Sequence, residues 1–149
     1  MKEFTHQVKI SVPIEAVAEF HRDARILRRL TMPPIIVQIH EVEPLDEGSK
    51  ADFTLWIGPL PVRWLAVHSQ VDTVNGFTDT QVRGPFRKWV HRHSFIALDE
   101  HTTEIRDEIQ AEMATHPFWY FVCWFMWLGL PMMFAYRGWV VRRALEKVT

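Results

Sequence analysis

Two histidines alternate with two large aromatic side chains over a short stretch, as Trp89, His91, His93 and Phe95. In an extended strand, side chains two positions apart point to the same face, so these four share one face of a sheet. Because two of them are large apolar rings, we expect that face to be the inner one. An imidazole held there could pair with a carboxylate, move a proton or ligate a metal ion.

Carboxylates are expected opposite these two imidazoles. A turn over residues 99–101 places His93 opposite Asp107, and a turn over 84–85 brings Asp79 next to His91. The sequence thus predicts two Asp–His pairs inside an aromatic surround. In such a pair the carboxylate fixes the tautomer of the ring and raises the pKa of the His. The same two turns place two further pairs side by side, namely Phe95 with Ile105 and Phe77 with His93.

This cluster has three interpretations, which the sequence leaves open. The pairs could satisfy one another and fix the register of the strands, as buried polar groups commonly do. They could hold the carbonyl or hydroxyl oxygen at the polar end of an apolar ligand. His91 or His93 could also act as a general acid or base on an enolisable carbonyl, the chemistry of a cyclase or dehydrase. We assign no catalytic residue, and we expect no metal ion or other cofactor, because no third ligand can be named beside the two histidines.

Alternating apolar and polar residues predict the strands that carry these groups. Residues 4–12 form the first strand. Two short helices follow at 14–21 and 23–30, and consecutive prolines end the second one. Six further strands begin at residue 35, with short turns between them, and the later ones cover 51–57, 62–74, 77–83, 86–98 and 102–113. This order predicts a seven-stranded antiparallel sheet in an α+β fold.

The last part of the chain differs from the rest, since no residue between His116 and Arg137 is charged. Gly129 and Pro131 interrupt this apolar run, and apolar residues at helical spacing follow them as far as Val148. We therefore predict one long C-terminal helix, bent or interrupted near 129–131. The run is long enough for a membrane span, but its breaks divide it into pieces too short to cross. A core helix that also lines a cavity is the favoured interpretation, followed by a helix docked on a membrane surface.

Composition narrows the function classes. With 149 residues, 48% of them hydrophobic and 23% charged, the chain has the size of one globular domain, 1–149, and is not disordered. The net charge of −1 argues against a nucleic-acid partner, and Cys123, the single cysteine, is expected to be a small core residue. The first residues lack the apolar core of a secretory signal, so we expect a cytoplasmic or membrane-peripheral protein. The 7 Trp and 10 Phe residues either fill a large core or line a cavity for an apolar molecule.

Three motifs carry a family resemblance, and they are Phe77-x-Asp79-x-Gln81-x-x-Gly84-Pro85-Phe86-x-x-Trp89-x-His91-x-His93-x-Phe95, Thr103-x-Ile105-x-Asp107 and Phe134-Ala135-Tyr136-Arg137. With the predicted order of elements, they resemble the helix-grip fold of the START-related superfamily over essentially the whole chain. The bacterial polyketide cyclase/dehydrase-like and coenzyme-Q-binding-like subgroup is the most similar. The resemblance implies a curved sheet wrapped around a long C-terminal helix, with a cavity for lipids, isoprenoids, quinones, sterols or aromatic polyketides.

We therefore expect a protein that binds a small hydrophobic molecule between the sheet and the C-terminal helix. A cyclase or dehydrase-type enzyme using the His91, His93, Asp79 and Asp107 cluster is the alternative, and a peripheral membrane lipid carrier is a further one. The predicted ligand-binding residues are Phe53, Trp64, Phe77, Asp79, Gln81, Trp89, His91, His93, Phe95, Ile105, Asp107, Phe118, Phe121, Phe125 and Phe134.

Two surface features suggest further partners. The second short helix carries Arg22, Arg25, Arg28 and Arg29, which are expected on a solvated face or against anionic lipid headgroups. Trp56 has the opposite parity to its apolar neighbours in the strand and is expected on the outer sheet face. There it would mark a contact with a membrane or with a second copy of the chain in a homodimer.

Overall fold

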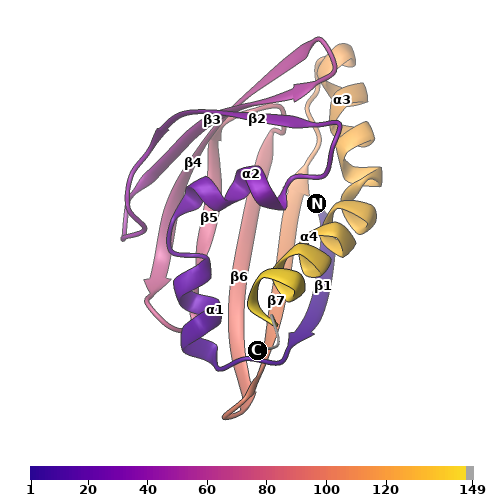
Figure 1. Cartoon of the computed structure of the whole chain (residues 1–149). Helices are drawn as coiled ribbons and strands as arrows, with labels where there is room; N and C mark the ends of the chain where they lie inside the picture. The colour runs from indigo at the N-terminus through magenta and orange to yellow at the C-terminus, as the bar shows by residue number, and fades with distance from the viewer. Residues whose placement is uncertain (147–149) are drawn as a thin grey trace.

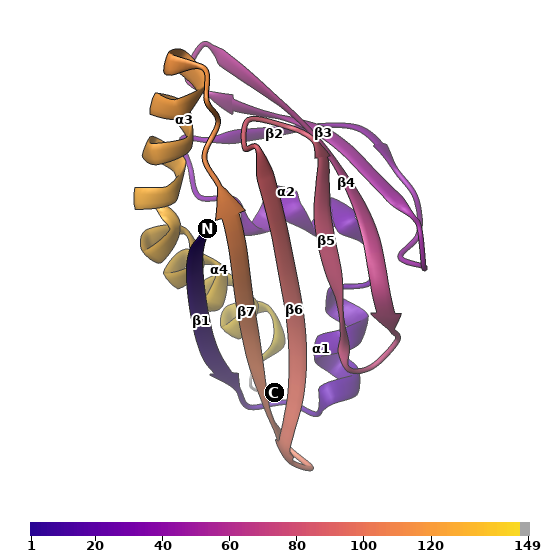
Figure 2. The ribbon, with the colours of Figure 1, turned by 180° about the vertical axis from the view of Figure 1, so that it is seen from behind.

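A curved antiparallel sheet, closed on its concave side by helices, makes up the computed structural model, which describes residues 1–146 (Figure 1). The strand order is β1-β7-β6-β5-β4-β3-β2, so β2 to β7 form a meander and β1 closes on β7 (Figure 2). This confirms the predicted seven-stranded α+β architecture, with η1 and α2 together forming the second short helix. The elements along the chain are β1 (Lys2–Ile10), α1 (Ile14–Phe20), η1 (Ala24–Ile26), α2 (Leu27–Leu30), β2 (Ile36–Val42), β3 (Lys50–Ile57), β4 (Leu60–Asp72), β5 (Gly76–Arg83), β6 (Lys88–Asp99), β7 (Thr102–Glu112), α3 (Pro117–Leu128) and α4 (Leu130–Leu145).

The registers predicted for the central strands are confirmed. Asp79 of β5 lies opposite His91 of β6, and His93 lies opposite Asp107 of β7. Between β6 and β7 the register is continuous from Lys88 to Ala97, so the pleat holds the chemistry-bearing side chains on one face. The two aromatic neighbour pairs have the predicted partners too, Phe77 opposite His93 and Phe95 opposite Ile105.

Alternate residues of β4 point to the inner face of the sheet. Trp64, Ala66 and His68 are buried, while the residues between them are more exposed. The register with β5 shifts between Leu65 and Ala66, yet the alternation of burial continues through this irregularity. His68 therefore reaches the same inner face as the histidines of β6. Trp56 of β3, whose neighbours Leu55 and Ile57 line the concave side, donates its indole N–H to Gln38 at 2.9 Å.

The C-terminal apolar run forms two helices rather than one. α3 and α4 are bent by 47° at Gly129, and Pro131 stands in the first turn of α4, where its missing N–H costs no hydrogen bond. The predicted interruption is confirmed, whereas Val148 lies outside the described residues. Within residues 1–146 no single helix is long and apolar enough to cross a membrane, and only the bent pair together has that length and composition.

Two groups of buried side chains lie on the concave side of the sheet. One joins the sheet to α3 and the start of α4, and it contains the aromatic residues Phe53, Trp64, Phe86, Trp89 and Phe134. The other lies under α1 and the end of α4, and it contains Ile10, Val17, Phe77, Phe95, Ile105 and Val141. Helix α4 packs against β1 at Gly138, where a Cβ would be in van der Waals contact with the Val8 side chain at 3.4 Å.

Candidate functional site

A cavity of about 520 Å³ lies between the inner face of the sheet and helices α2, α3 and α4. Its walls are mainly apolar, and a group of ionisable side chains lies on the sheet side. Nine of the predicted site residues line it, namely Phe53, Trp64, Phe77, Asp79, Trp89, His91, His93, Phe125 and Phe134.

The prediction is wrong for two aromatic residues of α3. Phe118 and Phe121 are 48% and 72% exposed, and neither borders the cavity. The buried side of α3 carries Val122 and Cys123 instead. The sequence could not reveal this, because an uncharged helix has no polar stripe to mark its outer face.

Four other residues predicted to bind the ligand, Gln81, Phe95, Ile105 and Asp107, do not line the cavity either. Gln81 holds the turn between β5 and β6, since its amide donates to the Phe86 carbonyl at 2.7 Å and accepts from the Phe86 N–H at 3.2 Å. Phe95 and Ile105 are buried in the second core group. Asp107 is hydrogen-bonded to His91 and lies 3.3 Å from Nδ1 of His93.

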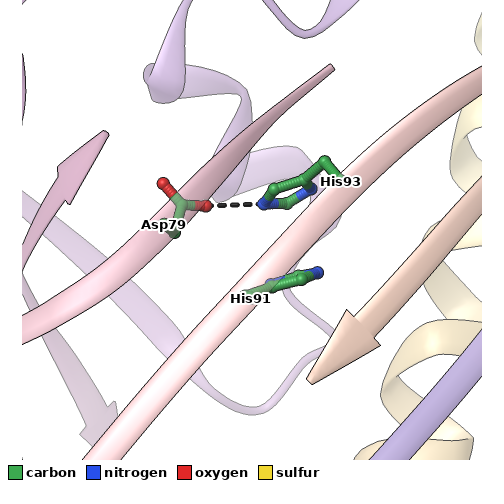
Figure 3. A group of neighbouring side chains, drawn as sticks. All are labelled: Asp79, His91 and His93. Carbon is green, nitrogen blue, oxygen red and sulfur yellow. Dashed lines mark hydrogen bonds and ion pairs between the residues drawn. The ribbon is translucent and has the colours of Figure 1, made fainter. Parts of the chain in front are cut away.

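A network of five side chains crosses four neighbouring strands. His68 of β4 donates from Nε2 to Asp79 Oδ1 at 2.9 Å, and His93 of β6 donates from Nε2 to Asp79 Oδ2 at 2.5 Å (Figure 3). Asp107 Oδ1 on β7 accepts from His91 Nε2 at 2.8 Å and lies 3.3 Å from His93 Nδ1.

The predicted Asp–His pairs therefore exist with exchanged partners. The backbone register aligns Asp79 with His91, but the short hydrogen bond of Asp79 goes to His93, two residues further along β6. Likewise Asp107 lies opposite His93 but makes its short bond to His91. Residues on diagonal positions of neighbouring strands are within reach of long side chains, and the imidazole spans that distance.

Ring stacking fixes the two imidazoles. The rings of His91 and His93 are stacked with centroids 3.8 Å apart, and Phe77 stacks on His93 at 4.3 Å. The edge contact of Phe134 with His91, at 5.6 Å, brings helix α4 onto the same stack.

Three groups of this network, His93, Asp79 and Asp107, are charged although they are buried. Burial opposes the charged form of His93, but the nearby carboxylates of Asp79 and Asp107 outweigh it and raise the pKa of His93 to about 9. Burial also opposes ionisation of both carboxyls, yet the histidines around them hold the pKa of Asp79 and of Asp107 well below the usual range. The centre of the network is therefore an imidazolium between two carboxylates.

Two other histidines are kept neutral. Burial, reinforced by the positive charge of His93, lowers the pKa of His91 to about 4. Burial likewise lowers the pKa of His21 to about 4, against a hydrogen bond from its Nδ1 to the Val17 carbonyl at 2.8 Å. Each neutral ring donates one N–H to the protein, which leaves its second nitrogen with a free lone pair.

The sequence prediction missed several polar cavity residues, among them His68, His21 and Arg137. His68 has the parity of Trp64, a signal that was present, and the Ser49 hydroxyl lies 2.8 Å from its Nδ1. His21 and Arg137 come from helices, and both line the cavity. Two sequence signals marked Arg137: it follows the long uncharged segment, and it ends the motif Phe134-Ala135-Tyr136-Arg137.

Asp79, His91 and His93 also have the composition of a cation site, since one ligand atom from each lies within 4.8 Å of the others. These atoms are arranged for pairing with each other, because the Nε2 proton of His93 stands between its ring and Asp79. A metal ion at that point would have to displace this proton, which two carboxylates stabilise. We therefore assign no metal ligand to the cluster.

Comparisons with known proteins identify the fold. No protein-family model matches the chain, and no curated protein matches it. A START superfamily protein from Mycobacterium smegmatis is 13% identical, with 99% of each chain covered and a TM-score of 0.69. A Streptomyces aromatase/cyclase is 15% identical over 96% of this chain and 95% of its own, with a TM-score of 0.65. A nucleoside-diphosphate sugar epimerase from Corynebacterium glutamicum is 26% identical over 96% of this chain but only 29% of its own, with a TM-score of 0.73.

The chain therefore has a helix-grip fold like that of the START superfamily protein and the aromatase/cyclase. Proteins with this fold include both binding proteins and enzymes, so function has to be argued from the cavity and its polar groups.

Proposed function

We propose that this protein binds a small hydrophobic molecule, of the lipid, isoprenoid, quinone or aromatic polyketide kind, in the cavity between its sheet and its C-terminal helices. The observation that carries the proposal is the cavity itself, about 520 Å³ in a chain of this size, with walls of aromatic and aliphatic side chains. Ligand sites are commonly concave, apolar and furnished with a few convergent polar groups. Here the polar groups are concentrated around Asp79 and the histidines of β6.

A neutral fluorescent probe tests the proposal. N-phenyl-1-naphthylamine is apolar and uncharged, so its saturable binding reports a hydrophobic cavity without help from charge. Ala66 is buried and lines the cavity, so Ala66→Phe should fill it and weaken probe binding by at least about tenfold. Val67→Phe adds the same ring to the other face of the same strand and should leave binding unchanged.

The result would count against the proposal if the probe showed no saturable binding, or if Ala66→Phe bound it like the parent protein. Thermal unfolding of both variants shows whether the fold persists, because overpacking can destabilise a core. Native mass spectrometry of the purified protein, followed by solvent extraction, would identify the chemical class of any bound compound.

A second candidate function is a cyclase or dehydrase-type enzyme. The observation in its favour is His91, which lines the cavity and is neutral, and whose Nδ1 has no hydrogen-bond partner within residues 1–146. Such a nitrogen could accept a proton from an enolisable carbonyl compound. Exchange of the α-protons of a bound aromatic ketone in D₂O, followed by NMR, should then be lost in His91→Gln while ketone binding persists.

A peripheral lipid carrier is the third candidate, and the rim of the cavity favours it. Phe125, Leu128 and Met132 line the cavity and are also 56%, 72% and 60% exposed, so apolar surface continues from the interior to the outside of α3 and α4. Pelleting with liposomes should therefore occur and should be lost in Leu128→Ser. Absence of pelleting with both neutral and anionic liposomes would remove this candidate.

A further inference from the structure

Arg137 of α4 is the one cation of the cavity lining that comes from the C-terminal helices. Its Nε is buried without a hydrogen-bond partner, and within residues 1–146 its guanidinium makes no ion pair. The contact that it does make is with the Phe134 ring, whose centroid lies 5.0 Å from the guanidinium carbon. The contact with an aromatic face offsets only a small part of the free-energy cost of desolvating the guanidinium. Burial accordingly lowers the pKa of Arg137.

The carboxylates nearest to Arg137 are already engaged. Asp79 and Asp107 act on it through their charge, but both carboxylates are bonded to histidines and lie beyond ion-pair distance of the guanidinium. Other arginines have acidic partners, for example Arg63 with Asp52 at 2.7 Å. Arg137 therefore lines the cavity, and no group of residues 1–146 accepts a hydrogen bond from its Nε or forms an ion pair with its guanidinium.

We propose that Arg137 is an anion-binding subsite of the cavity and that it takes the carboxylate of an apolar monocarboxylic acid whose body fills the aromatic chamber. This inference rests on the proposed binding function and specifies the chemistry of the ligand's polar end. The fork of the guanidinium matches a carboxylate in two parallel hydrogen bonds. A neutral carbonyl would satisfy the N–H groups but leave the buried charge without a counterion.

A single negative charge fits the site better than a phosphate monoester. Two arginines line the cavity, but Arg22 is already paired with Glu19 at 2.9 Å, which leaves Arg137. The two carboxylates of Asp79 and Asp107 on the facing sheet repel additional negative charge. The imidazolium of His93 is already held between those carboxylates. An acid with one charge and a long apolar body can therefore pair its carboxylate with Arg137 and pack its apolar body against the aromatic walls of the cavity.

Competition with the neutral probe N-phenyl-1-naphthylamine tests the subsite. Dodecanoic acid, dodecan-1-ol and dodecyl phosphate carry the same apolar body and differ in the head group. At pH 7 the acid should displace the probe at least about tenfold more effectively than the alcohol, as expected for charge-assisted hydrogen bonds in a partly desolvated site. In Arg137→Met this preference should disappear while the alcohol binds as before, and the exposed Arg143→Met on the same helix should keep it.

The outcomes separate the two proposals. If the probe itself does not bind, the proposed function fails. If probe and alcohol bind but the acid is no better than the alcohol, the binding function stands and the carboxylate subsite is wrong. Tighter binding of the phosphate than of the acid, or an acid preference that survives in Arg137→Met, also overturns it. If Arg137→Met does not fold, Arg137→Lys replaces it: a smaller acid preference than in the parent protein supports the subsite, because Lys lacks the planar fork, and an unchanged preference overturns it.

Discussion

The buried charge of His93 predicts how the stability of this protein depends on pH. His93 has a pKa of about 9 in the folded protein, against an ordinary value of 6.5 in the unfolded chain. Below pH 6.5 the ring is protonated in both states, so its stabilising contribution is fully present. Above pH 6.5 the unfolded chain loses this proton while the folded protein keeps it, so stability must fall until the pH passes about 9.

The size of the effect follows from the gap between the two pKa values. At about 1.4 kcal/mol per pH unit, this gap corresponds to about 3 kcal/mol of unfolding free energy lost between pH 6.5 and pH 9. For a domain of this length, a loss of that size lowers the unfolding temperature by roughly 6–12 °C. On the acid side, His21 and His91 have pKa values of about 4 and resist protonation, so stability should also fall as the pH drops from 6.5 toward 4.

The assay is denaturant unfolding followed by tryptophan fluorescence from pH 4 to pH 9.5, and we expect a maximum of stability near pH 6.5. His93→Gln should be less stable and should lose the alkaline decline, because no group at that position then titrates. His101→Gln, a change at an exposed turn, should keep the decline and serves as the matched control. A parent protein equally stable at pH 6.5 and pH 9 would refute the charge separation argued for the network.

Three further predictions concern stability and surface. Asp107→Ala leaves His91 and His93 without their shared acceptor and should lower the unfolding free energy by about 3–5 kcal/mol, measured by urea unfolding; a loss below about 1 kcal/mol would contradict the network. Gly76→Ala should prevent folding or cost at least about 3 kcal/mol, because its φ is +128° and a Cβ would lie 2.0 Å from the His93 carbonyl oxygen; near-parental circular dichroism and unfolding temperature would disprove this. Phe121→Ser should change stability by less than about 0.5 kcal/mol, since that ring is 72% exposed, and a large loss would place Phe121 back in the core.

Much of this fold could be predicted from short-range patterns. Strand parity in β6 placed His91 and His93 on one inner face, and the turn lengths placed Asp79 and Asp107 on the neighbouring strands, as the structure confirms. Parity and register are local properties, because the pleat has a fixed period and short turns fix the pairing of adjacent strands.

The candidate site was predicted less completely. On the sheet side the predicted strand registers are confirmed, but four predicted residues do not line the cavity and the hydrogen-bond partners are exchanged, because those partners depend on side-chain reach across the sheet. The helical side was not predicted correctly, because α3 carries no polar stripe and all its faces look alike in the sequence. Phe118 and Phe121 were therefore assigned to the cavity although they are exposed, and Phe125 alone of those three rings lines it.

The sequence by itself determined the order of elements, the inner face of β6 and the break near Gly129. Only the tertiary structure decided that His68, His21 and Arg137 meet at the cavity, because these residues come from β4, the end of α1 and α4, which are far apart along the chain. The physical reason is that a curved sheet brings distant elements around one volume, and the geometry of that closure sets which side chains are desolvated together. Desolvation and the neighbouring charges then set the protonation of His91 and His93. The same closure of the fold places Arg137 at the cavity without an acidic partner in the part of the chain described.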